Sequence, residues 1–199
     1  MRTAIILTLL GGLLIQGNTD AQAFSSESAH EHGVAALDIA QQGMALDIFL
    51  QSPLANLLGF EHAAKNAAQR QQIAELTEYL QSGLWLQFPP AANCRVISTD
   101  LQGLADAAKA AGESASHADQ SAHQHEHQHS HDEASHGHTD LQLTQRFVCQ
   151  NPAALNQIEL PLFAKAVDLQ RLNVQWVNLK GQGATTLTKA SSMLTWQAN

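Results

Sequence analysis

The chain is poor in positive charge, in cysteine and in methionine, and each scarcity argues against a class of function. Ten Lys and Arg residues stand against 18 Asp and Glu, so the formal net charge is −8 with neutral histidines. Such an acidic chain is a poor partner for nucleic acid and a good one for cations. Its three methionines and two cysteines offer few soft ligands for Cu(I).

The chain also lacks the usual marks of an enzyme or of a membrane-spanning protein. No Gly-x-Ser-x-Gly elbow occurs, and no nucleophile–base pair stands out in the sequence. We therefore predict a protein without enzymatic activity. Beyond residue 23 no segment is long and apolar enough to cross a bilayer, which takes about twenty residues.

The first residues have the pattern of an export signal. Met1-Arg2 give a positive start, an apolar run covers residues 4–15, and Ala21-Gln22-Ala23 is a small-x-small cleavage site. No cysteine follows the run, so no lipid anchor is indicated. We predict a signal peptide over 1–23 and a mature, soluble chain over 24–199 that lies outside the cytoplasm and forms one domain.

Histidine is what the chain has in abundance. Eight of its 11 histidines fall within 22 residues: His117, His123, His125, His127, His129, His131, His136 and His138. Neutral imidazole is the commonest metal ligand, and a tract with interleaved carboxylates and few apolar residues can hold divalent metal but cannot build a core. Five of these histidines alternate, so in extended chain their rings face one side and neighbouring pairs can chelate an ion. The alternative is a solvated low-complexity loop without function.

Hydrophobic patterns predict an α+β fold in which antiparallel hairpins pack with one longer and one or two shorter helices. The expected elements are hairpins over 34–51 and 172–189, strands over 84–88, 94–101, 141–149 and 158–162, a helix over 61–80, and helical turns near 104–111 and 163–168. A long disordered loop, 103–140, separates sub-halves 24–101 and 141–199. A weak internal duplication, in which each half mixes a β-hairpin with a helix, is an open alternative.

The two cysteines of this exported chain, Cys94 and Cys149, predict one disulfide. Because they lie at the strand ends that flank the loop in sequence, we expect the bond to pin both ends of the loop. Closure would contribute about 4 kcal/mol as an upper estimate. The rival interpretation, two thiolates that bind zinc, lacks a Cys-x-x-Cys spacing in support.

A second, smaller set of ligand candidates lies outside the tract. Its members are His30, His32, Glu61, His62, His138 and Asp140. If these segments meet, they offer an ordered nitrogen and oxygen site. Each also has a plain explanation, since Glu61 fits the dipole at a helix start, His62 fits a helix surface, and the first two histidines fit a frayed terminus.

These residues occur in an order that resembles a known family. Ala-His-Glu-His-Gly-Val over 29–34, Ser52-Pro53, Gly-Phe-Glu-His over 59–62, Cys94, the histidine tract, His-Thr-Asp-Leu over 138–141 and Phe-Val-Cys-Gln-Asn-Pro over 147–152 follow one another. The pattern is similar to that of the periplasmic, zinc-regulated ZrgA-like proteins of Gram-negative bacteria. Family members often carry Ser-Glu-Phe after the last loop histidine, where this chain has Thr139-Asp140-Leu141 with a shorter carboxylate.

The resemblance implies a histidine-rich zinc-binding protein linked to zinc uptake, with Zn2+ as its ion and an ABC importer or its binding protein as a partner. Ligand chemistry alone also admits Ni2+ or Cu2+. Two other functions stay open at this point. One is a buffer against excess zinc, nickel or copper, and the other is a metal- or pH-dependent protein-interaction module.

Overall fold

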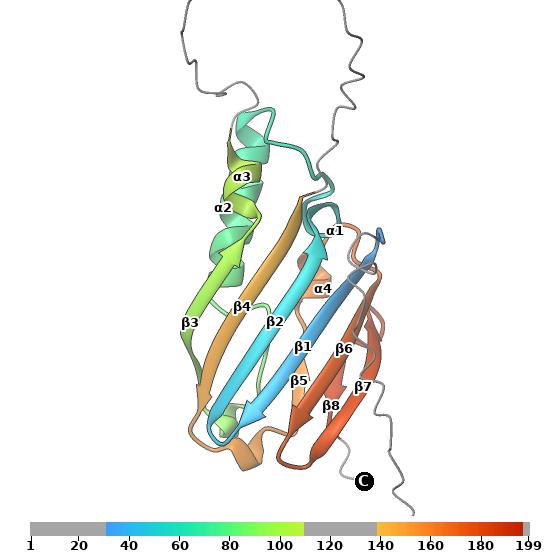
Figure 1. Ribbon diagram of the computed structural model, residues 1–199. Helices are drawn as coiled ribbons and strands as arrows, with labels where there is room; N and C mark the ends of the chain where they lie inside the picture. The colour runs from blue at the N-terminus through green and yellow to red at the C-terminus, as the bar shows by residue number, and fades with distance from the viewer. Residues whose placement is uncertain (1–30, 110–138, 197–199) are drawn as a thin grey trace, which may run out of the picture.

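A six-stranded sheet forms the body of the computed structural model, which describes residues 31–109 and 139–196 (Figure 1). The strand order is β3-β4-β2-β1-β6-β7, and β5 pairs with β8 in a separate two-stranded sheet. The strands are β1 (Val34–Gln42), β2 (Ala45–Pro53), β3 (Cys94–Gln102), β4 (Asp140–Cys149), β5 (Gln157–Glu159), β6 (Arg171–Asn178), β7 (Gly181–Thr188) and β8 (Met193–Thr195). The helices are α1 (Leu54–Leu58), α2 (Ala67–Gln81), α3 (Leu104–Ala108) and α4 (Leu162–Lys165), with short 3-10 turns η2 (Pro90–Ala92) and η3 (Pro152–Ala154).

The sheet confirms the predicted α+β class and both predicted hairpins, β1–β2 and β6–β7. Strands from both sides of the histidine tract join one sheet, because β4 pairs with β2 and with β3. The central pair β1–β6 is parallel, whereas the other pairs of the large sheet are antiparallel. None of the helices in the described residues is long and apolar enough to cross a membrane.

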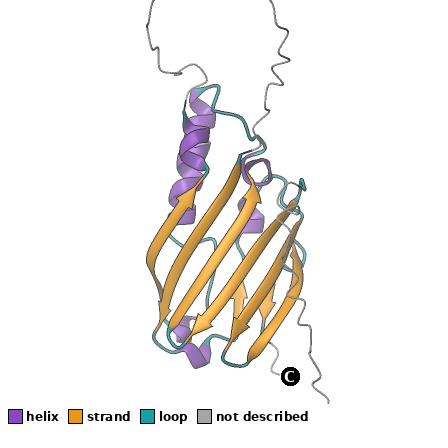
Figure 2. Cartoon of the chain, in the orientation of Figure 1, coloured by secondary structure: helices purple, strands orange, loops and turns teal. Residues whose placement is uncertain are grey.

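One face of the sheet carries the core and the other faces solvent, as the strict alternation in β1, β2 and β4 requires. The buried set includes Leu37, Ile39, Leu46, Ile48, Leu50, Leu141, Leu143 and Phe147. Figure 2 shows the small sheet behind the large one, and the long helix at the upper-left end of the large sheet. Each fully buried leucine or isoleucine contributes about 1.5–3 kcal/mol through removal of its side chain from water.

The predicted bounds of a helix and a hairpin, and one predicted strand, need correction. The long helix begins at Ala67 and not at residue 61, because Asn66 caps it by accepting a hydrogen bond from the backbone N–H of Gln69 at 2.9 Å. The short helix α1 follows β2 directly, and β2 includes Ser52 and Pro53, which were expected to end the hairpin. Residues 84–88 form turns with a single bridge, Gln87 to Glu159, and not a strand.

The disulfide Cys94–Cys149 is present, which confirms the pairing and excludes free thiolates as zinc ligands. The predicted position of this bond, at the ends of the histidine-rich loop, was wrong. Cys94 pairs with Cys149 at one end of the β3–β4 ladder, whereas Gln102 pairs with Gln142 at the other end, next to residues 103–139. The bond therefore closes the ladder at the far end from the histidine-rich segment and does not pin that segment's ends.

Candidate metal centre

The turn that precedes β1 is held in place by one buried side chain, Asn56 of α1. The Gly33 N–H donates to Asn56 Oδ1 at 2.7 Å, and Asn56 Nδ2 donates to the Val34 carbonyl oxygen at 2.8 Å. Asn56 Nδ2 also contacts Ser52 Oγ at 3.2 Å, and the Asn56 side chain is fully buried. These bonds fix the backbone on both sides of Gly33 and so determine where the adjacent His32 lies.

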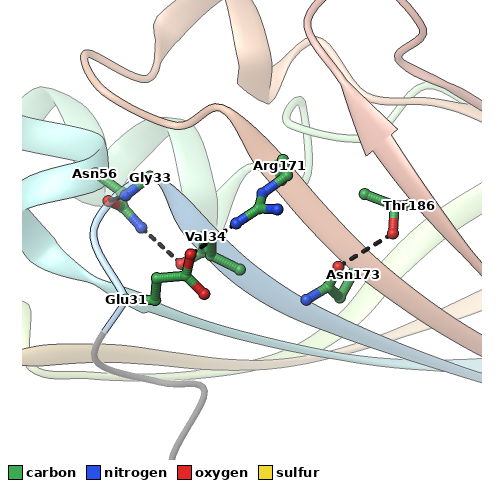
Figure 3. Close-up of polar contacts among 7 residues, drawn as sticks. All are labelled: Glu31, Gly33, Val34, Asn56, Arg171, Asn173 and Thr186. Atoms are coloured by element: carbon green, nitrogen blue, oxygen red, sulfur yellow. Dashed lines mark hydrogen bonds and ion pairs between the residues drawn. The ribbon is translucent and has the colours of Figure 1, made fainter.

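The same turn is tied to β6 from its other side, as Figure 3 shows. Arg171 donates to Glu31 Oε1 at 2.6 Å, and the Gly33 carbonyl oxygen accepts the backbone N–H groups of Gln170 and Arg171, each at 2.9 Å. Gly33 has φ +80°, and an added Cβ would lie 3.0 Å from the Gln170 side chain. Only glycine adopts this turn without strain.

His62 follows α1 in an irregular segment, and its ring has two neighbours. Gly59, with φ 78°, ends α1, and the His62 ring then stacks on Phe60 with centroids 5.2 Å apart. His62 Nδ1 lies 2.9 Å from the Ala63 carbonyl oxygen. This contact suits the tautomer with hydrogen on Nδ1, which is the tautomer that offers the Nε2 lone pair to a metal.

His32 and Glu61 come together from segments 29 residues apart in sequence. His32 Nε2 lies 3.9 Å from Glu61 Oε1. Two ligands of a tetrahedral zinc ion, each about 2.1 Å from the metal, lie roughly 3.4 Å apart. The observed pair is about half an ångström wider than that.

Asp140 starts β4 at the same end of the sheet. It pairs with Pro53, the last residue of β2, and the neighbouring Thr139 carbonyl oxygen accepts the Leu54 N–H at 3.0 Å. Gly103 packs against the Asp140 backbone so closely that a Cβ there would collide with the Asp140 carbonyl oxygen. Asp140 is partly buried.

The structure thus brings four of the predicted ligands, His32, Glu61, His62 and Asp140, to the end of the sheet where α1 lies. It does not bring three or more of them close enough to form a metal-binding group among residues 31–109 and 139–196. The other predicted ligands lie outside the described residues; these are His30, His117, His123, His125, His127, His129, His131, His136 and His138.

Sequence reasoning missed two residues that organise this end of the sheet, Asn56 and Arg171. Asn56 lies in an apolar stretch, Leu-Ala-Asn-Leu-Leu, where a polar residue is unusual and could have indicated a buried polar contact. Arg171 had no comparable signal, since its partner Glu31 lies 140 residues away.

Two comparisons with known proteins bear on identity. A family model described as "ZrgA family zinc uptake protein" matches residues 29–196. No curated protein matches the chain significantly. The matched range contains every described residue and covers most of the chain, so the chain belongs to the ZrgA family of zinc uptake proteins.

Proposed function

We propose that this chain is an exported, periplasmic zinc-binding protein that captures Zn2+ and supports zinc uptake. The histidine-rich segment collects ions, and an ordered site at the α1 end of the sheet holds one. Family membership supports the link to zinc. The approach of His32 to Glu61 across two separate segments is the observation that carries the ordered site.

The ordered site is completed in this proposal by two histidines adjacent to fixed backbone. His30 directly precedes Glu31, whose side chain is bound to Arg171. His138 directly precedes Thr139, whose carbonyl oxygen is bound to the Leu54 N–H. Consecutive Cα atoms lie about 3.8 Å apart, and this adjacency in the chain is the reason that the proposal includes the two histidines.

Capture belongs to the tract from His117 to His138, where many near-equivalent imidazole pairs offer fast and weakly ordered binding. Ordering a long segment costs conformational entropy, which lowers its affinity for each ion. A site on preformed strands and a buried clamp costs less to organise. Ions therefore move from the tract to the ordered site and on to an ABC importer or its binding protein.

Protonation of the ligating histidines favours the release of zinc in this proposal. Ligating imidazoles must be neutral, so zinc affinity falls as pH drops through about 6.5, where free imidazole gains its proton. Imidazole and carboxylate suit Zn2+ but also accept Ni2+ or Cu2+. Selection of zinc in this proposal rests on the family.

Native mass spectrometry over a titration from limiting to excess Zn2+ tests the proposal on three forms of the mature chain. The full chain is expected to take several ions, and a form lacking residues 117–138 is expected to keep one tight ion. The same deletion combined with His32→Ala and His62→Ala is expected to keep none. A full chain that stays metal-free at mildly alkaline pH would overturn zinc binding, and tight binding by the third form would overturn the ordered site.

A further inference from the structure

The strand β7 presents an unpaired edge over residues 181–187. Among residues 31–109 and 139–196 its ladder partner is β6, and only its last residue, Thr188, forms backbone hydrogen bonds elsewhere, with Ser191. A row of unpaired backbone groups on such an edge is a template for another strand, and most proteins block it with charges, proline or a bulge. β7 has none of these within Gly181–Thr188, whose sequence is Gly-Gln-Gly-Ala-Thr-Thr-Leu-Thr.

The other edge of the sheet, β3, is protected in the usual ways. It carries the exposed charged residues Arg95 and Asp100, and its pairing with β4 shifts register between Val96 and Ser98. A bulge and charges of both signs discourage strand addition. The contrast singles out β7 as the edge that is left open.

A groove runs along β7 on the side of the small sheet. One wall is β7 itself, and the other is formed by Ser191 and by β8, including Met193 and Thr195. Met193 is 45% exposed, and Leu179, in the turn that leads into β7, is 73% exposed. A strand laid along the edge would place alternate side chains over this groove.

The C-terminal segment that contains β7 carries no acidic residue. No Asp or Glu occurs after Asp168, although the chain carries a formal charge of −8, and the nearest acidic residue on the small sheet is Glu159, which pairs with Met193. Lys180 and Lys189 flank β7 at its two ends, both are exposed, and neither forms an ion pair within the described residues. An occupant with a carboxylate near each end would be complementary.

We propose that the β7 edge binds an extended segment of a partner protein, which adds as a strand and carries uncharged residues between two acidic ones. Backbone hydrogen bonds supply affinity, and the two lysines supply selectivity. A second copy of this chain is a poor occupant. Antiparallel β7–β7 pairing centred between Ala184 and Thr185 would set Lys180 opposite Lys189 at both ends.

A charge-swap experiment on the full mature chain tests this proposal. The probe is a fluorescent ten-residue peptide of alternating Ser and Val between two terminal Asp residues, and its match has terminal Lys residues. The wild-type chain is expected to prefer the Asp peptide in anisotropy titrations at low salt. The pair Lys180→Glu and Lys189→Glu is expected to weaken that binding about tenfold and to favour the Lys peptide. Arg95→Glu, on the opposite edge of the sheet, is the control and should leave the affinity for the Asp peptide unchanged.

Hydrogen–deuterium exchange locates the peptide. Slower exchange on peptide addition is expected over residues 181–188 and not over β3. Equal affinity of the wild-type chain for both peptides, or absence of binding, overturns the proposal. So does protection, in the free chain, of the outward-pointing amides of residues 181–187 that do not bond to β6, which would mean that a second copy or another part of this chain already covers the edge.

Discussion

Asn56→Ala is the substitution with the largest predicted effect at the candidate metal centre. It leaves the Gly33 N–H and the Val34 carbonyl oxygen, both buried, without the partners they have at 2.7 and 2.8 Å. Each buried backbone group left without a hydrogen bond costs about 1–3 kcal/mol. The free energy of unfolding should therefore fall by about 2–5 kcal/mol, a large share of the roughly 5–15 kcal/mol typical of a domain.

Urea denaturation measures this change, and Asn173→Ala is the matched control. Asn173 also uses its side chain in a hydrogen bond, with Thr186 Oγ1 at 3.2 Å, but it is exposed (Figure 3). Loss of this hydrogen bond should lower the free energy of unfolding by less than about 0.5 kcal/mol. Equal midpoints for the two variants would refute the idea that Asn56 holds the turn.

Asn56→Asp separates folding from metal binding if the alanine variant fails to fold. The aspartate keeps the acceptor for Gly33 and loses the donor to Val34. In the form without residues 117–138, we expect it to bind the tight zinc ion at least about tenfold more weakly, because supporting residues outside the ligand shell typically contribute 10–100-fold to affinity. Unchanged zinc affinity in a folded Asn56→Asp protein would remove His32 from the ligand set.

Three further predictions concern the scaffold. Replacing Cys94 and Cys149 by serine should lower the free energy of unfolding by up to about 4 kcal/mol in thermal or urea melts, with zinc stoichiometry unchanged because the bond lies at the far end of the β3–β4 ladder. Gln145→Leu should cost about 2–4 kcal/mol by the same assay, since it strips Trp85 Nε1 of its acceptor at 2.8 Å and leaves the indole buried. Partial burial raises the pKa of Asp38, so its charged form opposes folding, fully so above that raised pKa. Because the side chain is also exposed and solvent screens its charge, Asp38→Asn should stabilise the protein by at most a few tenths of a kcal/mol at pH 7, and melts should show this gain vanishing below the ordinary value of 3.8.

Much of the large sheet could be predicted because its strands bury one face. Alternation in β1, β2, β4 and β6 follows directly from that burial, and each was predicted within a few residues. The start of α2 was misplaced because Glu61, Ala63, Ala64 and Lys65 continue the helical composition upstream. The capping pair Asn66 and Gln69 marked the true start.

Long-range pairing had no local signal. The parallel contact between β1 and β6 joins Val34 to Arg171, and nothing in either strand's own pattern specifies that neighbour. The candidate site was predictable in its ligand types and only in part in its geometry. His32 meets Glu61 because a buried amide and a distant arginine fix the turn before β1, and such support is invisible until the chain is folded.

The position of the disulfide separates the scaffold from its histidine-rich insertion. Residues 110–138 connect two neighbouring strands whose pairing runs from Gln102–Gln142 to a covalent bond at Cys94–Cys149. In the loop-closure model, doubling the length of a connection adds only about 0.6 kcal/mol of closure cost. Under the proposed function, the number of imidazoles between these two strands can therefore change at small energetic penalty, so that the capacity to bind zinc is adjustable while the sheet stays the same.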